Sequence, residues 1–268
     1  MKDDPFEFLK KVGESGAGPH DIARAALMLA ALDHPRTPLE PYLSHLQEIQ
    51  DAMSEQSGLI QRVEDGARAV SDLLAGRLGY DGDRLDYDNP RNADLMSVIE
   101  RRRGLPVALG ILYIHAARAG GMLASGLNTQ SHFVLRLTLR GEDMTIDPFH
   151  GGAVIDRAHV PVELAPDDAG LAQLVSDTDV LLRLQNNLKL RALNAGDHMR
   201  GLELTRRMVL LAPRRSDLWL DLARLNEALG VLGAARGAYE SCLALAPPGE
   251  ALHNEAAISL SQLKRRLN

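Results

Sequence analysis

Three segments in the first hundred residues repeat their hydrophobic positions every three to four residues, which is the period of an amphipathic helix. The first segment begins at His20-Asp21 and ends at Pro35, and the second begins near Thr37-Pro38. The third is the most regular, and its apolar positions are Leu59, Ile60, Val63, Ala67, Val70, Leu74 and Leu78. The pattern predicts a helical N-terminal layer in which each helix buries one face.

A polar stretch from Gly79 to Asn92 separates these helices from the most hydrophobic part of the chain. Its acidic residues alternate with others, as in calcium loops, but the glycine and terminal glutamate of an EF-hand are missing, so a turn-rich connector is the simpler interpretation. The aspartates concerned are Asp81, Asp83, Asp86 and Asp88. A short helix is expected around 94–103, and a longer one from Pro106 to Gly120 is apolar on nearly all sides. Such a helix should lie buried in the centre of a domain.

The hydrophobic period changes from helical to alternating after Gly120-Gly121. Apolar and polar residues alternate from His132 to Leu139, which is typical of a strand with one buried face. We expect a turn at 140–143 and a second strand from Met144 to Asp147. Helices followed by a small antiparallel sheet predict an α+β domain.

The chain becomes helical again from about Asp177, and a repeat appears there. Leu211-Ala212-Pro213 recurs as Leu245-Ala246-Pro247 at an offset of 34 residues, the period of tetratricopeptide repeats. The unit from Ser216 to Pro247 carries residue types expected for that repeat, namely Trp219, Leu222, Ala223, Ala235 and Tyr239, while Asn226 departs from the expected tyrosine. We therefore predict one domain over 1–170 and a helical repeat region over 177–268.

Composition excludes several classes of function. The net charge of −6 argues against non-specific nucleic-acid binding, which needs a basic surface. One cysteine, Cys242, permits no intramolecular disulfide. The first residues lack the apolar core of a signal peptide, and no apolar run is long enough for a membrane span. We therefore expect a cytoplasmic protein with no membrane or nucleic-acid partner.

Four short motifs occur in order along the central part of the chain. They are YDNPRN at 87–92, ERRRGLP at 100–106, SHF at 131–133 and IDPF at 146–149. Together they resemble the bacterial SirB family, in which a transglutaminase-like domain is followed by tetratricopeptide helices, and the resemblance covers nearly the whole chain. It implies a papain-like transglutaminase-type core, with a buried central helix packed against the small antiparallel sheet.

The resemblance also implies where a catalytic site would lie. In active transglutaminase-like proteins a cysteine begins the central helix, where the helix N-terminus favours its thiolate, and a histidine and an aspartate follow on successive strands. His132 matches the histidine and Asp147 the aspartate. The nucleophile position falls between Pro106 and Ala108, and no residue there carries a nucleophilic atom. Because Cys242 occupies a packing position of the last repeat, we expect an inert thiol and a pseudo-enzyme.

The spacing of the remaining pair depends on the turn between the two strands. A turn centred on Gly141-Glu142 would place Asp147 opposite Arg136, four residues from His132. A turn one residue earlier, together with a bulge, would bring Asp147 and His132 closer. A purely structural role for His132 and Asp147, as a polar pair that holds the sheet against the central helix, also stays open.

Two functions remain open at this stage. The first is a non-catalytic protein-protein interaction or regulatory module that binds a protein or peptide partner. The expected groove residues are Asn128, Gln130, His132, Asp147, Arg224 and Asn226. The alternative is a hydrolase in which His132 and Asp147 activate water. A metal-dependent version would add His150 as a third ligand, but no ligand spacing such as HxxxH supports it, and we expect neither metal nor cofactor.

Overall fold

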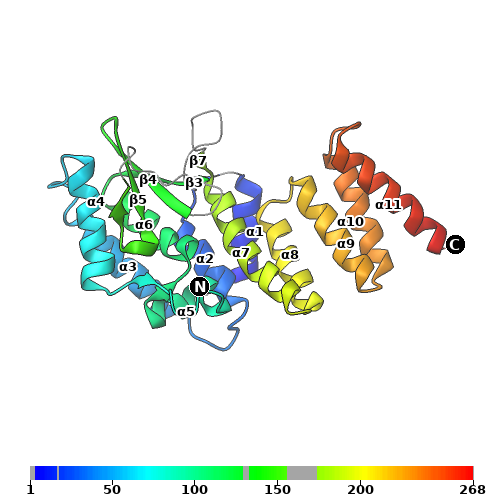
Figure 1. Ribbon diagram of the computed structural model, residues 1–268, viewed down its shortest axis with the longest axis horizontal. Coiled ribbons are helices and arrows are strands. Elements are labelled where there is room, and N and C mark those ends of the chain that lie inside the picture. The colour runs from blue at the N-terminus through cyan, green and yellow to red at the C-terminus, as the bar shows by residue number, and fades with distance from the viewer. Residues whose placement is uncertain (1–3, 17, 129–132, 156–173, 268) are drawn as a thin grey trace. The chain divides into compact units, whose positions relative to one another are not determined.

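The structure, a computed structural model, describes residues 4–16, 18–128, 133–155 and 174–267. The chain forms two compact units (Figure 1). The first comprises Met1–Phe8 and Ala17–Leu184, and the second comprises Leu9–Gly16 and Gln185–Asn268. The border thus falls inside helix α7 (Asp177–Asn194), a few residues later than the expected boundary, because one continuous helix serves both units. Most of the N-terminal helix α1 (Pro5–Ser15) also belongs with the repeats rather than with the expected N-terminal layer.

The predicted helical layer of the first unit is present. It contains α2 (Ile22–Ala31), α3 (Glu40–Ser54), α4 (Val63–Ser71) with a π-helical turn η1 (Asp72–Arg77), η2 (Pro90–Ala93) and α5 (Leu95–Arg101). Asp21 caps α2 by accepting a hydrogen bond from the Arg24 N–H at 3.1 Å. Helix α4, which corresponds to the third predicted segment, begins at Val63 rather than at Leu59. Leu59 lies before the helix and is 79% exposed.

The central helix α6 runs from Pro106 to Ala119 and is buried along most of its length, as its composition predicts. It packs against strands β3 (Leu123–Asn128) and β4 (Phe133–Leu139), beside which it lies in Figure 1. Gly110 makes this contact possible, since a Cβ at that position would lie 2.3 Å from Cε1 of Phe133. The helix therefore covers one face of the sheet and lies directly against Phe133, the last residue of the SHF motif.

Within the described residues the sheet has five strands in the order β6-β5-β4-β3-β7, and all neighbouring pairs are antiparallel. The strands are β3 (Leu123–Asn128), β4 (Phe133–Leu139), β5 (Glu142–Asp147), β6 (Ala153–Val154) and β7 (Leu174–Val175). The sequence did not predict β3, because Ser125 and Gly126 are poor strand formers. Gly126 is nevertheless required there, since a Cβ would lie 2.7 Å from Val175.

The hairpin between β4 and β5 corrects the predicted turn. Leu139 pairs with Glu142, and the two residues between them, Arg140 and Gly141, have φ angles of 51° and 86°. Two successive positive φ angles are typical of a two-residue hairpin turn, so β5 begins at Glu142 rather than at Met144. Asp147 therefore does not lie opposite Arg136, because Arg136 pairs with Thr145. The alternative turn, one residue earlier than Gly141-Glu142, is the one that the structure contains.

The second unit is helical and contains the predicted repeat. Its helices are the C-terminal part of α7, α8 (His198–Leu211), α9 (Ser216–Ala228), α10 (Leu232–Leu245) and α11 (Ala251–Leu267). Ala223, Ala235 and Tyr239 are buried, as their repeat positions predict. Ion pairs join Lys189 to Asp221 at 2.9 Å and Arg224 to Glu255, so α7, α9 and α11 are neighbours. Among the described helices of either unit, none has the length and hydropathy needed to cross a membrane.

Candidate functional site

The first turn of α6 occupies the position where the resemblance places a nucleophile. Pro106 stands at the first helical position, where its missing N–H leaves no hydrogen bond unmade. Pro106, Val107 and Ala108 are all buried, and their side chains contain only carbon and hydrogen. The helix start is therefore preserved as a structural element, but nothing in it can attack a carbonyl carbon.

The motif at 87–92 and the arginine run at 101–103 hold this helix start in place. The Arg101 guanidinium donates to Asp83 Oδ2 at 2.7 Å and to Asn92 Oδ1 at 2.8 Å. Asn92 is fully buried, and its main-chain carbonyl accepts a hydrogen bond from the N–H of Leu105, the residue before α6, at 2.9 Å. Burial raises the pKa of Asp83, but hydrogen bonds from the Asp86 N–H and from Arg101 outweigh this effect and leave the pKa lowered. These motif residues therefore act as a lock on the loop rather than as a reactive group.

The same loop also contains one strand of a short parallel pair that the sequence pattern did not predict. Strands β1 (Asp81–Gly82) and β2 (Arg103–Gly104) pair in parallel and join the polar loop to the segment before α6. Asp81 forms an ion pair with Arg84 at 3.0 Å. In the part of the chain that the structure describes, no three histidine, cysteine, aspartate or glutamate side chains come together to hold a metal ion.

Asp147 lies at the end of β5 and is almost completely buried. One carboxylate oxygen accepts the N–H of Phe149 at 2.9 Å, which caps the short helix η3 (Pro148–His150). The other accepts a hydrogen bond from Nδ1 of His150 at 2.6 Å. The sequence suggested a role for His150 only as a metal ligand, whereas the structure makes it a direct partner of Asp147. The spacing of the pair, three residues across an Asp-Pro turn, could have indicated this contact.

The predicted partner His132 lies outside the described residues, as does Gln130, so the His132–Asp147 pair stays a prediction. Asn128 is placed by its backbone only. Asn128 is the last residue of β3 and pairs with Phe133, so its backbone belongs to the sheet.

Aromatic and cationic side chains contact Phe149, the residue between Asp147 and His150 that follows Pro148, and a second cation–aromatic pair involves Phe133 on β4. The Phe149 ring makes edge-to-face contacts with Tyr87, at 5.8 Å between ring centroids, and with His150, at 5.4 Å. The Arg84 guanidinium lies 5.5 Å from the Phe149 centroid, and that of Arg183 lies at the same distance from Phe133. Tyr87 and Phe149 belong to the sequence motifs, but neither arginine carried a signal that could have identified it.

The two groove residues predicted in the repeat region, Asn226 and Arg224, differ in exposure. Asn226 is 2% exposed, and its side-chain amide donates to the Leu222 carbonyl at 2.8 Å. It therefore packs inside the repeat and cannot contact a partner, so its assignment to a binding groove was wrong. Arg224 is half exposed and pairs with Glu255. Cys242 is completely buried, and burial raises the pKa of its thiol, which disfavours the reactive thiolate.

Comparison with known proteins agrees with this architecture. The model for the transglutaminase-like superfamily matches residues 40–186, which is more than half of the chain. The chain belongs to the transglutaminase-like superfamily. A tetratricopeptide-repeat model matches residues 188–268 and completes the predicted combination. The transglutaminase-like region thus begins at α3 and ends in α7.

Several relatives share parts of this transglutaminase-like chain. A UPF0162 protein of Xylella fastidiosa (strain 9a5c) is 29% identical over 237 residues, which cover 84% of each chain. A UPF0162 protein of Vibrio cholerae is 30% identical over 137 residues, half of each chain. F-box only protein 21 of Mus musculus is 33% identical over 97 residues, 35% of this chain and 16% of its own length. The likeness to the F-box protein therefore covers only a small part of that protein.

Proposed function

We propose that this chain is a non-catalytic transglutaminase-like protein of the SirB family that acts in the bacterial cytoplasm as a protein-interaction or regulatory module. The observation that carries the proposal is the first turn of α6, which offers no nucleophile from Pro106 to Ala108. Covalent acyl transfer requires an atom that attacks the carbonyl carbon. The one cysteine of the chain is buried in α10, in the other unit, and does not replace it.

The repeat helices supply the interaction surface of this proposal. Leu190, Arg224 and Ile258 follow one another at intervals of 34 residues, so they occupy the same position on α7, α9 and α11. Leu190 is 49% exposed and Ile258 is 60% exposed, while Arg224 between them is held by Glu255. We call these three residues the repeat stripe. Exposed apolar residues on both sides of a fixed ion pair fit a peptide or helix with matching apolar side chains.

Turnover assays test the catalytic half of the proposal. Purified protein is incubated with a glutaminyl peptide plus an amine, and separately with ester, thioester and amide substrates. We expect no product above that of a buffer blank, and the same result for His132→Ala and Asp147→Ala. Turnover that disappears in the Asp147→Ala variant would refute the pseudo-enzyme assignment.

Partner capture tests the other half. Wild-type bait is compared with Leu190→Glu and Ile258→Glu baits, which place a charge on the repeat stripe. Val231→Glu is the matched control, because Val231 is 45% exposed in the same unit but lies outside the stripe. A partner retained by the wild type and the control, and lost from both stripe variants, is the expected result. Equal retention by all four baits would exclude the stripe as the interaction surface.

A hydrolase remains the second candidate, and one observation favours it. The buried carboxylate of Asp147 holds a histidine ring nitrogen at 2.6 Å, as the orienting aspartate of a catalytic dyad does. In the proposed alternative, His132 activates water with Asp147, and the contact with His150 orients that carboxylate. Hydrolysis lost in both His132→Ala and Asp147→Ala, but only reduced in His150→Ala, would support the hydrolase over the interaction module.

A further inference from the structure

The two units carry opposite net charge. The second unit contains 14 lysines and arginines and 9 aspartates and glutamates, whereas the first contains 16 and 27. The repeat unit is therefore positive by five charges in a chain whose net charge is −6. A positive unit attracts acidic partners over distances near the Debye length, about 8 Å at physiological salt.

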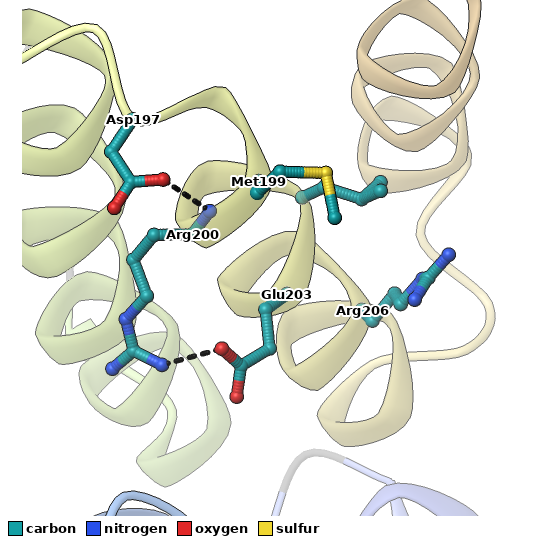
Figure 2. Close-up of a pocket in the computed structure, with 6 residues that line it drawn as sticks. Asp197, Met199, Arg200, Glu203 and Arg206 are labelled. Atoms are coloured by element: carbon teal, nitrogen blue, oxygen red, sulfur yellow. Dashed lines mark hydrogen bonds and ion pairs between the residues drawn. The ribbon is translucent and has the colours of Figure 1, made fainter. Parts of the chain in front are cut away.

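A cavity of about 430 Å³ lies at the beginning of α8 in this unit (Figure 2). Its lining residues are Asp197, Met199, Arg200, Leu202, Glu203 and Arg206. Most of the charges are already compensated within the helix. Asp197 caps α8 by accepting the Arg200 N–H at 2.9 Å, and the Arg200 guanidinium donates to Glu203 at 2.8 Å.

Arg206 differs from the other charged residues of the cavity. Its guanidinium makes no hydrogen bond or ion pair with the described residues, and the side chain is exposed. Figure 2 shows it pointing away from the Arg200–Glu203 pair. Glu203 is in turn occupied on both sides, because Arg207 binds its second oxygen. Among the described residues, the cavity therefore has one uncompensated cation, Arg206, whose N–H donors are available to a ligand.

The same cavity has an apolar wall. Met199 is 65% exposed, and Leu202 is buried beneath the helix surface. The methionine side chain is unbranched and adapts to the shape of a ligand. A single arginine beside a methionine favours a carboxylate and an apolar side chain that arrive together. A nucleic-acid backbone would need several free cations in a row, and among the described residues that line this cavity Arg206 alone is uncompensated.

We propose that this cavity, which is separate from the repeat stripe, binds an acidic segment of a partner protein. A glutamate or aspartate of the segment pairs with Arg206, and an adjacent apolar side chain packs on Met199. The site would give the repeat unit a preference for acidic partners that the repeat stripe alone does not provide.

Fluorescence anisotropy with the full-length chain tests this proposal. The probe is a fluorescein-labelled decapeptide of glutamate, leucine and glycine, with oligoglutamate of equal charge as a second probe. Arg206→Glu and Arg206→Gln are expected to weaken binding of the first probe at least about tenfold, since charge-assisted hydrogen bonds to a carboxylate are lost. Met199→Ser should weaken binding of the leucine-containing probe several-fold and leave that of oligoglutamate nearly unchanged.

The matched control is Arg265→Glu, which makes the same charge change at an exposed residue of α11. We expect this variant to bind within about twofold of the wild type, since an exposed charge distant from the ligand is screened by salt. Equal weakening by Arg265→Glu and Arg206→Glu would overturn the proposal in favour of general charge attraction. Absence of probe binding by the wild type, or equal competition by a single-stranded oligonucleotide of the same charge, would also overturn it.

Discussion

Two buried tyrosines differ in what their hydroxyl groups do. The Tyr80 hydroxyl contacts Nε2 of His45 at 2.8 Å and accepts a hydrogen bond from Arg102, and burial raises its pKa to about 12. The Tyr113 hydroxyl on α6 is buried and makes no hydrogen bond with the described residues, and burial raises its pKa further. A hydroxyl that is buried without a partner weakens the folded state relative to phenylalanine.

We therefore expect opposite results from the same substitution at these two positions. Tyr80→Phe should lower the free energy of unfolding by about 1–2 kcal/mol, because it removes two contacts of a buried network. Tyr113→Phe should leave it unchanged or raise it by up to about 1 kcal/mol. Urea denaturation of both variants measures the difference, and a loss of stability in Tyr113→Phe would mean that its hydroxyl is satisfied.

His45 should make the stability of the protein depend on pH. Burial and the nearby Arg102 guanidinium lower its pKa below the ordinary value of 6.5, with Glu48 acting in the opposite direction. The unfolded chain therefore binds a proton near pH 6.5 that the folded chain does not. The stability contributed by neutral His45 is fully present above about pH 6.5. It falls as the pH is lowered toward the folded-state pKa, by up to about 1.4 kcal/mol per pH unit.

Urea midpoints measured between about pH 7.5 and 5.5 check this dependence. The His45→Gln variant should lose most of the pH-dependent decrease. His198→Gln, at an exposed position of α8, is the matched control and should keep the wild-type profile. If both variants follow the wild-type curve, another group causes the decrease.

At the scale of single elements, glycine positions decide how closely helices and strands approach. Gly110 in α6 has no room for a methyl group, because a Cβ would meet the Phe133 ring at 2.3 Å. Gly237 in α10 has open space around its Cβ position. The same change to alanine should therefore affect the two helices in opposite directions.

Gly110→Ala should lower the free energy of unfolding by about 1–3 kcal/mol, since α6 and β4 must move apart. Gly237→Ala should raise it by about 0.5–1 kcal/mol, since alanine is the better helix former and nothing obstructs it. Thermal unfolding followed by circular dichroism compares both with the wild type. A stabilised Gly110→Ala variant would contradict the close packing of α6 on the sheet.

At the scale of the whole molecule, the two units provide separate spectroscopic signals. The one tryptophan, Trp219, lies in the second unit, and its Nε1 donates to the Pro213 carbonyl at 2.8 Å. Tryptophan fluorescence therefore reports the repeat unit, whereas far-ultraviolet circular dichroism reports the helices of both. Cys242 offers a way to perturb only the repeats, because it is completely buried there.

Cys242→Ser should lower the fluorescence midpoint in urea, since a hydroxyl buried without a partner costs about 1–3 kcal/mol. The dichroism curve should then become broader, because the first unit keeps its own transition. Ser241→Ala, at the neighbouring and only partly buried position, is the control and should leave both midpoints within error. Coincident shifts of the two signals in Cys242→Ser would show that the units unfold together.

Local sequence determined most of the elements and the absence of a nucleophile. Hydrophobic period indicated α2, α3, α6 and β4, because a buried face needs apolar residues at a fixed spacing whatever lies across from it. The 34-residue offset indicated the repeats for the same reason. The carbon-only side chains at 106–108 could be read directly, because reactivity requires an atom that is either present or absent.

Tertiary structure decided the contacts between residues distant along the chain. β3 exists although Ser125 and Gly126 disfavour a strand, because β4 and β7 pair with it on both sides. Asn226 looked polar and available in the sequence, but its neighbours bury it. Asp147 received its partner from the turn at η3. Among the described residues, Arg200 of the α8 cavity is paired with Glu203 whereas Arg206 has no ion-pair partner, and only the folded helix shows this difference. Pairing, burial and charge compensation depend on what lies nearby in space, and a linear pattern does not contain that information.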